Sequence, residues 1–323
     1  MISRREFLSA SAASSLAGLP VLAATPRPIR VVVPHPAGGA IDIVVRKITS
    51  IVTARQGQAF VVENIPGASG NIGTAVVARA QPDGQTLLAI NTTFSYTRQL
   101  FKNLPWTPQQ DPVPITSLIR TPEAIVVAGS SPYRTLQDLI DDAKARPGQL
   151  FYGTGGVGSP PHLGAEAFQQ AAGIALTHVP YKGASEVIVG ILSGAVQLMV
   201  SGVPSFTAHL RSGALRALGM ASLDQRRSPA YPEVPTYTQA GVPGIDGRSS
   251  WTGIAAPAGT PAPVLAHLQQ LFTAAQQTPE YTDYLVAQAS LPGGQTPQAL
   301  AQALLVERKY WSQVAERAGL SAV

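Results

Sequence analysis

Short runs of β-branched residues alternate along the chain with segments whose apolar residues recur at helical spacing. Residues 29–33, 60–63 and 86–90 are typical of buried strands, and the apolar positions after the first run recur every three or four residues, which indicates a helix. A second helix is expected over residues 71–80. This order predicts an α/β protein with a parallel sheet, whose ligands lie beyond the carboxyl ends of the strands.

The rest of the chain repeats this alternation after a change of direction. Residues 115–128 form two extended runs separated by Thr121 and Pro122, and residues 251–256 form another. We interpret these segments as two crossover strands between two α/β lobes that enclose a ligand cleft. The expected lobes are residues 25–121 with 250–323, and residues 122–249. The other expected elements are strands over 150–152, 177–180, 196–200 and 215–220, and helices over 136–145, up to about 172, and over 185–192, 261–277, 280–288 and 297–318.

Glycine-rich loops follow the strands in two places. Residues 35–39 join the first strand to its helix, and residues 153–159 (Gly-Thr-Gly-Gly-Val-Gly-Ser) lead into another helix. The first N–H groups of a helix have no partner within it and lie at the positive end of its dipole, so such a loop favours an anion such as a carboxylate or phosphate. An ordinary strand-to-helix connection remains the alternative.

The second loop also fits a dinucleotide-binding fingerprint, Gly153-x-Gly155-x-x-Gly158. That fingerprint has an acidic residue about 20 positions further on, and residues 171–179 contain none. Two prolines also stand where the pyrophosphate-binding helix would begin. We therefore expect neither a nucleotide nor any other cofactor.

The N-terminal segment has the layout of a cleavable signal peptide. Ser-Arg-Arg-Glu-Phe-Leu at residues 3–8 is followed by a mildly apolar, Ala/Ser-rich stretch to Leu22 and by the small residues Ala23 and Ala24. The paired arginines resemble a twin-arginine leader. We expect residues 1–24 to direct export to the periplasm and to be removed there.

Composition removes several classes of function. The chain has no cysteine, which excludes disulfides, a thiol nucleophile and cysteine-based metal sites. The formal net charge is +5, but Lys and Arg are scattered singly, so no nucleic-acid partner is expected. Neither Gly-x-Ser-x-Gly nor His-Glu-x-x-His occurs. We do not expect an enzyme, and an exported hydrolase with a Ser/His/Asp site assembled from distant residues is the alternative.

Six motifs in order carry a family resemblance. They are His-Pro-Ala-Gly-Gly-Ala-Ile-Asp (35–42), Val-Glu-Asn-Ile-Pro-Gly-Ala-Ser-Gly-Asn-Ile-Gly (62–73), Pro-Asp-Gly-Gln-Thr-Leu-Leu (82–88), His-Val-Pro-Tyr-Lys-Gly (178–183), Gly-Ala-Val-Gln-Leu-Met (194–199) and Ala-Pro-Ala-Gly-Thr-Pro (256–261). Together they resemble the Bug-type (TctC-like) extracytoplasmic solute receptors of tripartite tricarboxylate transporters. The resemblance covers nearly the whole chain after the leader.

This resemblance implies a two-lobed, type II periplasmic-binding-protein fold that closes on a small carboxylate. The carboxylate would be held by backbone N–H groups and hydroxyls of loops rather than by an arginine. The ligand-binding positions that the resemblance implies are Ala37, Gly38, Gly39, Asp42, Thr92, Thr93, Thr154, Gly155, Ser159, His162 and Ser201. Membrane transporter subunits are the implied partners, and a solute sensor that feeds a membrane signalling partner is an alternative. We expect a monomer.

Several of these positions have a second interpretation. Asp42 is as well placed to cap a helix or pin its loop as to reach a ligand amine. His162 and Glu166 lie four residues apart on the expected helix, but with no third ligand evident we expect no metal. Two positions depart from the family pattern: His35 replaces the usual Phe, and Ser201 stands where many relatives carry Asp or Asn.

Overall fold

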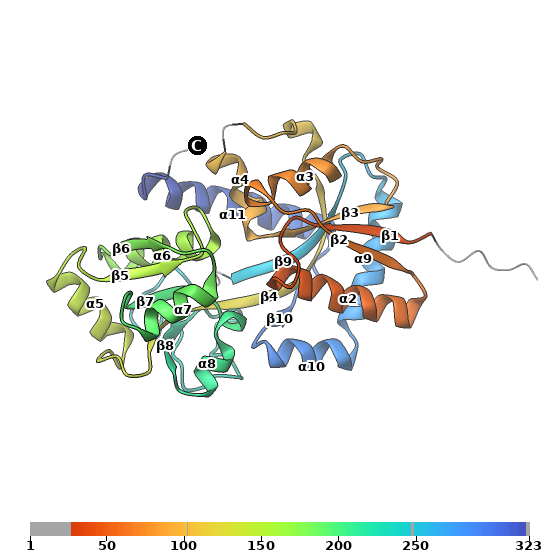
Figure 1. The fold of residues 1–323 in the computed structure, drawn as a ribbon. Helices are drawn as coiled ribbons and strands as arrows, with labels where there is room; N and C mark the ends of the chain where they lie inside the picture. Colours follow the sequence, from red (N-terminus) through yellow and green to blue (C-terminus); the bar gives the residue numbers. More distant parts are fainter. Residues whose placement is uncertain (1–26, 102, 247–248, 321–323) are drawn as a thin grey trace, which may run out of the picture.

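The computed structural model describes residues 27–101, 103–246 and 249–320, so the expected leader lies outside the described residues. Two lobes are built around one mixed sheet in the strand order β2-β1-β3-β9-β4-β7-β5-β6, with β8 and β10 also paired to β4. Figure 1 shows the first lobe on the right and the second on the left. The predicted two-lobed α/β architecture is confirmed.

The first lobe contains the three parallel strands that the sequence predicts. Its strands are β1 (Ile29–Val33), β2 (Phe60–Asn64) and β3 (Thr86–Asn91). Its helices and short turns are α2 (Ala40–Gln56), η1 (Ala68–Gly70), α3 (Asn71–Ala78), α4 (Thr92–Leu100) and η2 (Pro108–Gln110). The carboxyl ends of the parallel strands meet at one edge, which is where the first glycine loop lies.

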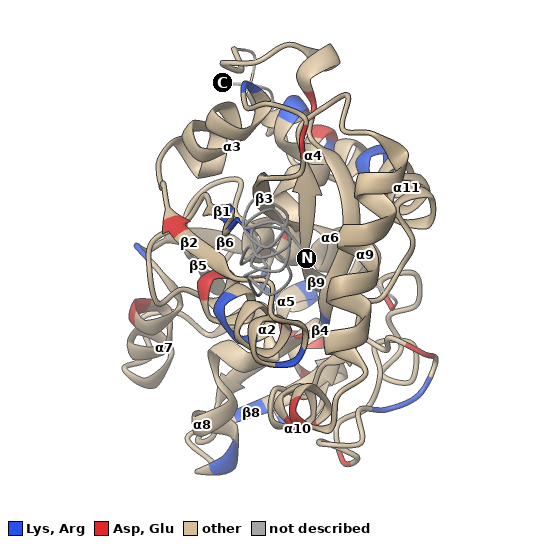
Figure 2. Ribbon diagram, turned by 90° about the vertical axis from the view of Figure 1, so that its right-hand side faces the viewer, with Lys and Arg blue, Asp and Glu red and all other residues tan. Residues whose placement is uncertain are grey.

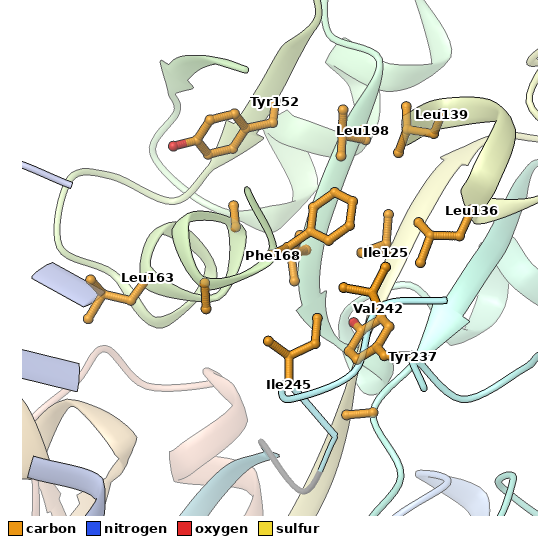
Figure 3. Packing of buried hydrophobic residues seen from close by; sticks show 14 of the residues in the cluster. Ile125, Leu136, Leu139, Tyr152, Leu163, Phe168, Leu198, Tyr237, Val242 and Ile245 are labelled. Carbon is orange, nitrogen blue, oxygen red and sulfur yellow. The ribbon is translucent and has the colours of Figure 1, made fainter. Parts of the chain in front are cut away.

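The second lobe follows the same plan. Its strands are β5 (Phe151–Thr154), β6 (Thr177–Pro180), β7 (Leu198–Gly202) and β8 (Leu215–Met220). Its helices are α5 (Leu136–Ala145), α6 (Pro160–Ala172), α7 (Ala184–Leu192), η3 (Val203–Ser205) and α8 (Thr207–Arg211). A core that includes Phe168, Leu198 and Tyr237 packs between α6 and the sheet (Figure 3).

The two expected runs over residues 115–128 are one continuous strand, β4 (Val113–Ala128). Up to Pro122 this strand pairs with β9 (Ser249–Ala256), and from Glu123 onward it pairs with β7. The expected break at Pro122 was therefore wrong. Proline lacks an N–H donor, and here it stands where the strand exchanges one partner for another, so the ladder continues without it.

Helix α4 was not expected, because the sequence suggested only polar residues after β3. Its sequence, Thr-Thr-Phe-Ser-Tyr-Thr-Arg-Gln-Leu, is rich in β-branched and aromatic residues of low helix propensity. Tyr96 is fully buried and packs edge-on against Trp311, with ring centroids 6.0 Å apart. Tertiary packing rather than local preference stabilises this helix.

The C-terminal helix contacts the cores of both lobes. After α9 (Ala262–Gln276), α10 (Pro279–Ala287) and the short β10 (Leu291–Pro292), the chain ends in α11 (Pro297–Arg317). Leu300 and Leu304 pack with Trp251 in the first lobe, while Trp311 and Val314 belong to the core of the second. Figure 1 shows α11 running along the side of the molecule from one lobe to the other.

Charged residues of both signs are interspersed over the ribbon in Figure 2. Among the described residues, no helix combines the length and apolar character that a membrane span requires.

One carboxyl group is buried where β4 exchanges partners. Glu123 is only 5% exposed, and its Oε1 accepts a hydrogen bond from the Ser250 hydroxyl (2.8 Å). It borders a cavity of about 10 Å³ whose walls include Tyr237 and Trp311. Burial raises the pKa of Glu123 to about 7, although the hydrogen bond from Ser250 acts to lower it.

We predict that Glu123 makes the protein less stable as the pH rises from 4.5 to about 7. In that range the folded protein holds a proton that the unfolded chain has released, so the loss reaches about 3 kcal/mol above the upper pKa. Urea unfolding at about pH 5 and pH 8 should show this loss for the wild type and a smaller one for Glu123→Gln. Glu63→Gln, at an exposed glutamate paired with Arg30, is the control and should behave as the wild type. An equal pH response in Glu123→Gln would contradict the prediction.

Candidate functional site

The first glycine loop is held by the carboxylate of Asp42. This residue lies in the first turn of α2 and is 3% exposed. It accepts hydrogen bonds from the Gly38 N–H (2.9 Å), from Arg46 Nε (2.9 Å) and from Asn64 Nδ2 (3.0 Å). Burial would raise the pKa of Asp42, but the hydrogen bonds from Arg46, Gly38 and Asn64 hold it below its usual value. In this arrangement Asp42 pins the loop to the helix.

The free backbone donors of this loop lie on either side of its two glycines. Gly38 donates to Asp42, in a left-handed conformation (φ 76°) that favours glycine, and Gly39 donates to the Pro36 carbonyl (3.3 Å). The N–H groups of Ala37, Ala40 and Ile41 have no acceptor among the described residues. Ala40 and Ile41 were missed from the sequence, although the unpaired first turn of any helix is the signal that points to them.

Thr92 and Thr93 are the first two residues of α4, and both are buried. The Thr92 hydroxyl accepts a hydrogen bond from the Trp251 N–H (3.2 Å), which connects the end of β3 to β9. The Thr93 hydroxyl donates to Asn91 Oδ1. Thr93 and His35 line the same small pocket of the first lobe.

The second glycine loop is held by three side chains. Thr154 Oγ1 lies 2.6 Å from His178 Nε2, and the Ser159 hydroxyl donates to the Gly156 carbonyl (2.7 Å). His162 Nδ1 accepts the Gly158 N–H (3.0 Å), which requires that nitrogen to be unprotonated. The N–H groups of Gly155 and Val157 are left without an acceptor among the described residues. This loop therefore also presents unpaired donors.

Three rings cluster at the second loop. The ring centroid of His178 lies 5.0 Å from that of Tyr152 and 4.0 Å from that of His162, and the centroids of Tyr152 and His162 are 6.2 Å apart. The Tyr152 hydroxyl donates to the carboxylate of Glu166. Burial lowers the pKa of His162, and burial together with the charge of His162 lowers that of His178 to about 4. Both imidazoles are therefore neutral at neutral pH.

The possible metal pair does not extend to a third ligand in the described part of the chain. His162 Nε2 and Glu166 Oε1 are 3.9 Å apart, but no group of three or more His, Asp or Glu side chains that could hold a metal is found there. Glu166 instead accepts hydrogen bonds from Tyr152 and from Gln169 (2.8 Å).

The structure gathers the expected residues into two groups, one in each lobe. Ser201 lies near the end of β7, at the same sheet edge as Thr154, and its hydroxyl is 3.5 Å from that of Ser205. Within the described residues, the candidate positions of one lobe do not touch those of the other. The second loop comes close to α4 of the first lobe, because a Cβ added at Gly158 would lie 3.0 Å from Leu100 Cδ1.

We predict that His178 makes the protein acid-sensitive. As the pH falls from 6.5 to about 4, the unfolded chain takes up a proton that the folded protein excludes, so stability is lost. His178→Gln keeps a polar group that can reach Thr154 but does not titrate, so it should lose less stability on acidification. Chemical unfolding at about pH 7 and pH 5 measures this. His267→Gln, at an exposed histidine of α9, is the control; an unchanged acid response in His178→Gln would refute the assignment.

Comparisons with known proteins agree with this geometry. The model of the TctC family, the tripartite tricarboxylate transporter family receptor, matches residues 44–320. The R. palustris protein Rpa4515, solved with adipate, superposes with a TM-score of 0.81 at 32% identity, over 92% of this chain and 99% of that one. MatC of Rhodopseudomonas palustris, solved with malate, has a TM-score of 0.77 at 29% identity, over 89% and 98%.

The periplasmic binding protein BugD is also similar, with a TM-score of 0.78 at 30% identity, over 92% of this chain and 99% of that one. Of these similar structures, BugD is a periplasmic binding protein, and the other two were solved with a small carboxylate. The family match extends over most of the chain, and the two pinned glycine loops lie at strand ends in both lobes. The chain therefore belongs to the TctC, or Bug, family of tripartite tricarboxylate transporter receptors.

Proposed function

We propose that this protein is a periplasmic receptor that captures a small carboxylate between its lobes and delivers it to the membrane subunits of a tripartite transporter. The observation that carries the proposal is the pair of glycine loops, one in each lobe, each of which heads a helix and presents unpaired N–H groups. Membership of the TctC family supports it. So do the relatives solved with adipate and malate, which are both dicarboxylates. The leader expected at residues 1–24 supports the periplasmic location.

In this proposal some residues of the loops donate hydrogen bonds to the ligand, and others hold the loops in shape. The N–H groups of Ala37, Gly155 and the first turn of α2 donate to the carboxylate, where bonds to an ionised acceptor are about twice as strong as neutral ones. Asp42 and His162 keep the two loops in shape. The remaining candidates, Gly38, Gly39, Thr92, Thr93, Thr154, Ser159 and Ser201, complete the walls of the site.

Binding would favour the closed arrangement of the lobes. A carboxylate held by donors from both loops stabilises only the state in which both loops reach it, so the ligand shifts the population toward closure. Two glycine loops on separate lobes meet the geometric requirement for such a shift, because neither loop alone surrounds the ligand.

A thermal-shift screen of the chain from Thr25 onward tests this function. The panel consists of adipate, malate, succinate, benzoate and an amino acid, with NAD and Mg²⁺ as unrelated probes. An acid at 100 times its dissociation constant should add about 2.7 kcal/mol of stability, which shows as a rise in Tm. A rise with one class of carboxylate supports the receptor. A response to NAD or Mg²⁺ with none to any acid would overturn it.

Removing the Asp42 carboxylate, which holds the first loop, should weaken binding. Asp42→Ala frees the Gly38 N–H and removes the bonds to Arg46 and Asn64, so we expect the affinity for the acid found in the screen to fall about tenfold or more. Calorimetric titration measures this change. Asp138→Ala is the matched control, because Asp138 caps the N-terminus of α5 in the same way. It should lower stability slightly and leave affinity unchanged. Equal affinities in the two variants would contradict the role given to Asp42.

A further inference from the structure

The first lobe contains a small polar pocket next to the proposed carboxylate site. It has a volume of about 20 Å³ and lies at the ends of β1 and β3, between α3 and α4. Its polar walls are His35, Ser69, Asn71, Thr74, Asn91, Thr93 and Thr97, and Trp106 and Phe94 supply apolar surface. In Figure 1, α3 is drawn above β3 and α4 to the left of α3.

Three polar side chains of this pocket, those of Ser69, Asn71 and His35, have no hydrogen-bond partner within the described chain. Asn71 is the first residue of α3 and is only 5% exposed, yet its side-chain amide makes no hydrogen bond to the described residues. The imidazole of His35 likewise makes none. Folded proteins pair nearly all of their buried polar groups. The Asn71 amide is not among the completely enclosed side-chain atoms without a partner in the described chain, so it faces the open space of the pocket, where a group from outside the chain can pair with it.

The threonines determine which kind of group fits. The hydroxyls of Thr74 and Thr97 donate their protons to the carbonyls of Gly70 and Thr93, each at 2.9 Å. The Thr93 hydroxyl donates to Asn91. These three hydroxyl oxygens consequently offer only lone pairs to an incoming group, which favours a group that donates a hydrogen bond.

The other groups that line the pocket favour an incoming group that is neutral and that accepts a hydrogen bond as well as donating one. The Asn71 amide carries both a donor and an acceptor. Burial lowers the pKa of His35, so its ring is neutral and offers one N–H and one lone pair. No Lys, Arg, Asp or Glu lines the pocket. A carboxylate would face three oxygen lone pairs without a balancing charge, and an ammonium would have no carboxylate partner.

The size of the pocket leads to the same conclusion. A space of about 10–15 Å³ holds one water molecule, so about 20 Å³ admits one oxygen-sized group. A carboxylate, with three heavy atoms, is too large. A hydroxyl has the required size, is neutral, and donates and accepts at once.

We propose that this pocket is a subsite for a hydroxyl group of the ligand, so that the receptor selects hydroxy-carboxylic acids over their non-hydroxylated counterparts. This inference rests on the proposed capture of a carboxylate by the neighbouring loops. Asn71 would donate to the hydroxyl oxygen, and a threonine oxygen or His35 would accept its proton. These residues determine specificity, whereas the glycine loops provide the affinity for the acid itself.

Calorimetric titration with pairs of acids that differ by one hydroxyl tests the subsite. The pairs are malate and succinate, lactate and propionate, and 4-hydroxybenzoate and benzoate. In the wild type the hydroxylated member of at least one pair should bind at least about tenfold more tightly, because a site built to hydrogen-bond a hydroxyl rejects the analogue that lacks it. Asn71→Leu and Thr97→Val should each reduce that preference to about threefold or less, mainly by weakening the hydroxylated acid.

Thr49→Val is the matched control. Thr49 is a buried threonine of α2 whose hydroxyl donates to the Val45 carbonyl (2.8 Å), which is the same intrahelical bond that Thr97 makes, but it lies outside the pocket. Its variant should keep the full hydroxyl preference. Thr97→Val also serves as the second variant if Asn71→Leu fails to fold.

The possible failures are distinguishable. If no acid of any pair binds the wild type, the subsite is overturned, and the proposed function is overturned with it only if no acid of the thermal-shift panel binds either. If acids bind but the members of each pair bind equally, the receptor function stands and the subsite is overturned, with water as the ordinary occupant of the pocket. The same holds if the hydroxyl preference survives in the folded pocket variants.

Discussion

The strand β4 is the element on which the rest of the structure depends, because both lobes are hydrogen-bonded to it. It pairs with β9 and β10 on the side of the first lobe and with β7 and β8 on the side of the second. The lobes are therefore joined through a sheet and not through a loose linker. Any opening or closing of the lobes has to bend β4 and β9 where the partners change, at Pro122 and Glu123. At that point Pro122 has no N–H to donate, and the buried carboxyl of Glu123 accepts a hydrogen bond from Ser250.

A second connection lies at the side of the molecule. Tyr96 of α4 and Trp311 of α11 pack into the core of the second lobe, although both helices also contact the first. Trp251 of β9 reinforces this connection by donating to Glu307 of α11 (3.0 Å). Relative movement of the lobes consequently requires these helices to slide against α6 or to move with it. A hydrophobic contact shared between lobes limits how far they separate, because separation exposes apolar surface to water.

In the proposed function, the two glycine loops bind the carboxylate without a cationic side chain directed at it. Glycines allow the backbone to turn, but side chains determine which N–H groups remain available. The Gly38 N–H donates to Asp42 and the Gly158 N–H donates to His162, so the N–H groups that remain free belong to neighbouring residues. The two pins differ chemically: one is a carboxylate supported by Arg46 and Asn64, and the other is a neutral imidazole in a ring stack. The loop of the second lobe is therefore the one whose shape depends on an uncharged histidine.

The sequence by itself determined the alternation of strands and helices, the two-lobed class and the place of both glycine loops. Helical spacing, β-branched runs and glycine positions are local signals, and the predicted helix over residues 136–145 and the strand over 215–220 agree with α5 and β8. Only the tertiary structure decided that β4 continues through Pro122, that α4 is a helix, and that α11 contacts both cores. It also decided which N–H groups are free, brought His178 next to His162, and left Asn71 unpaired in a pocket. These features depend on residues far apart in the chain, whose partners no local pattern specifies.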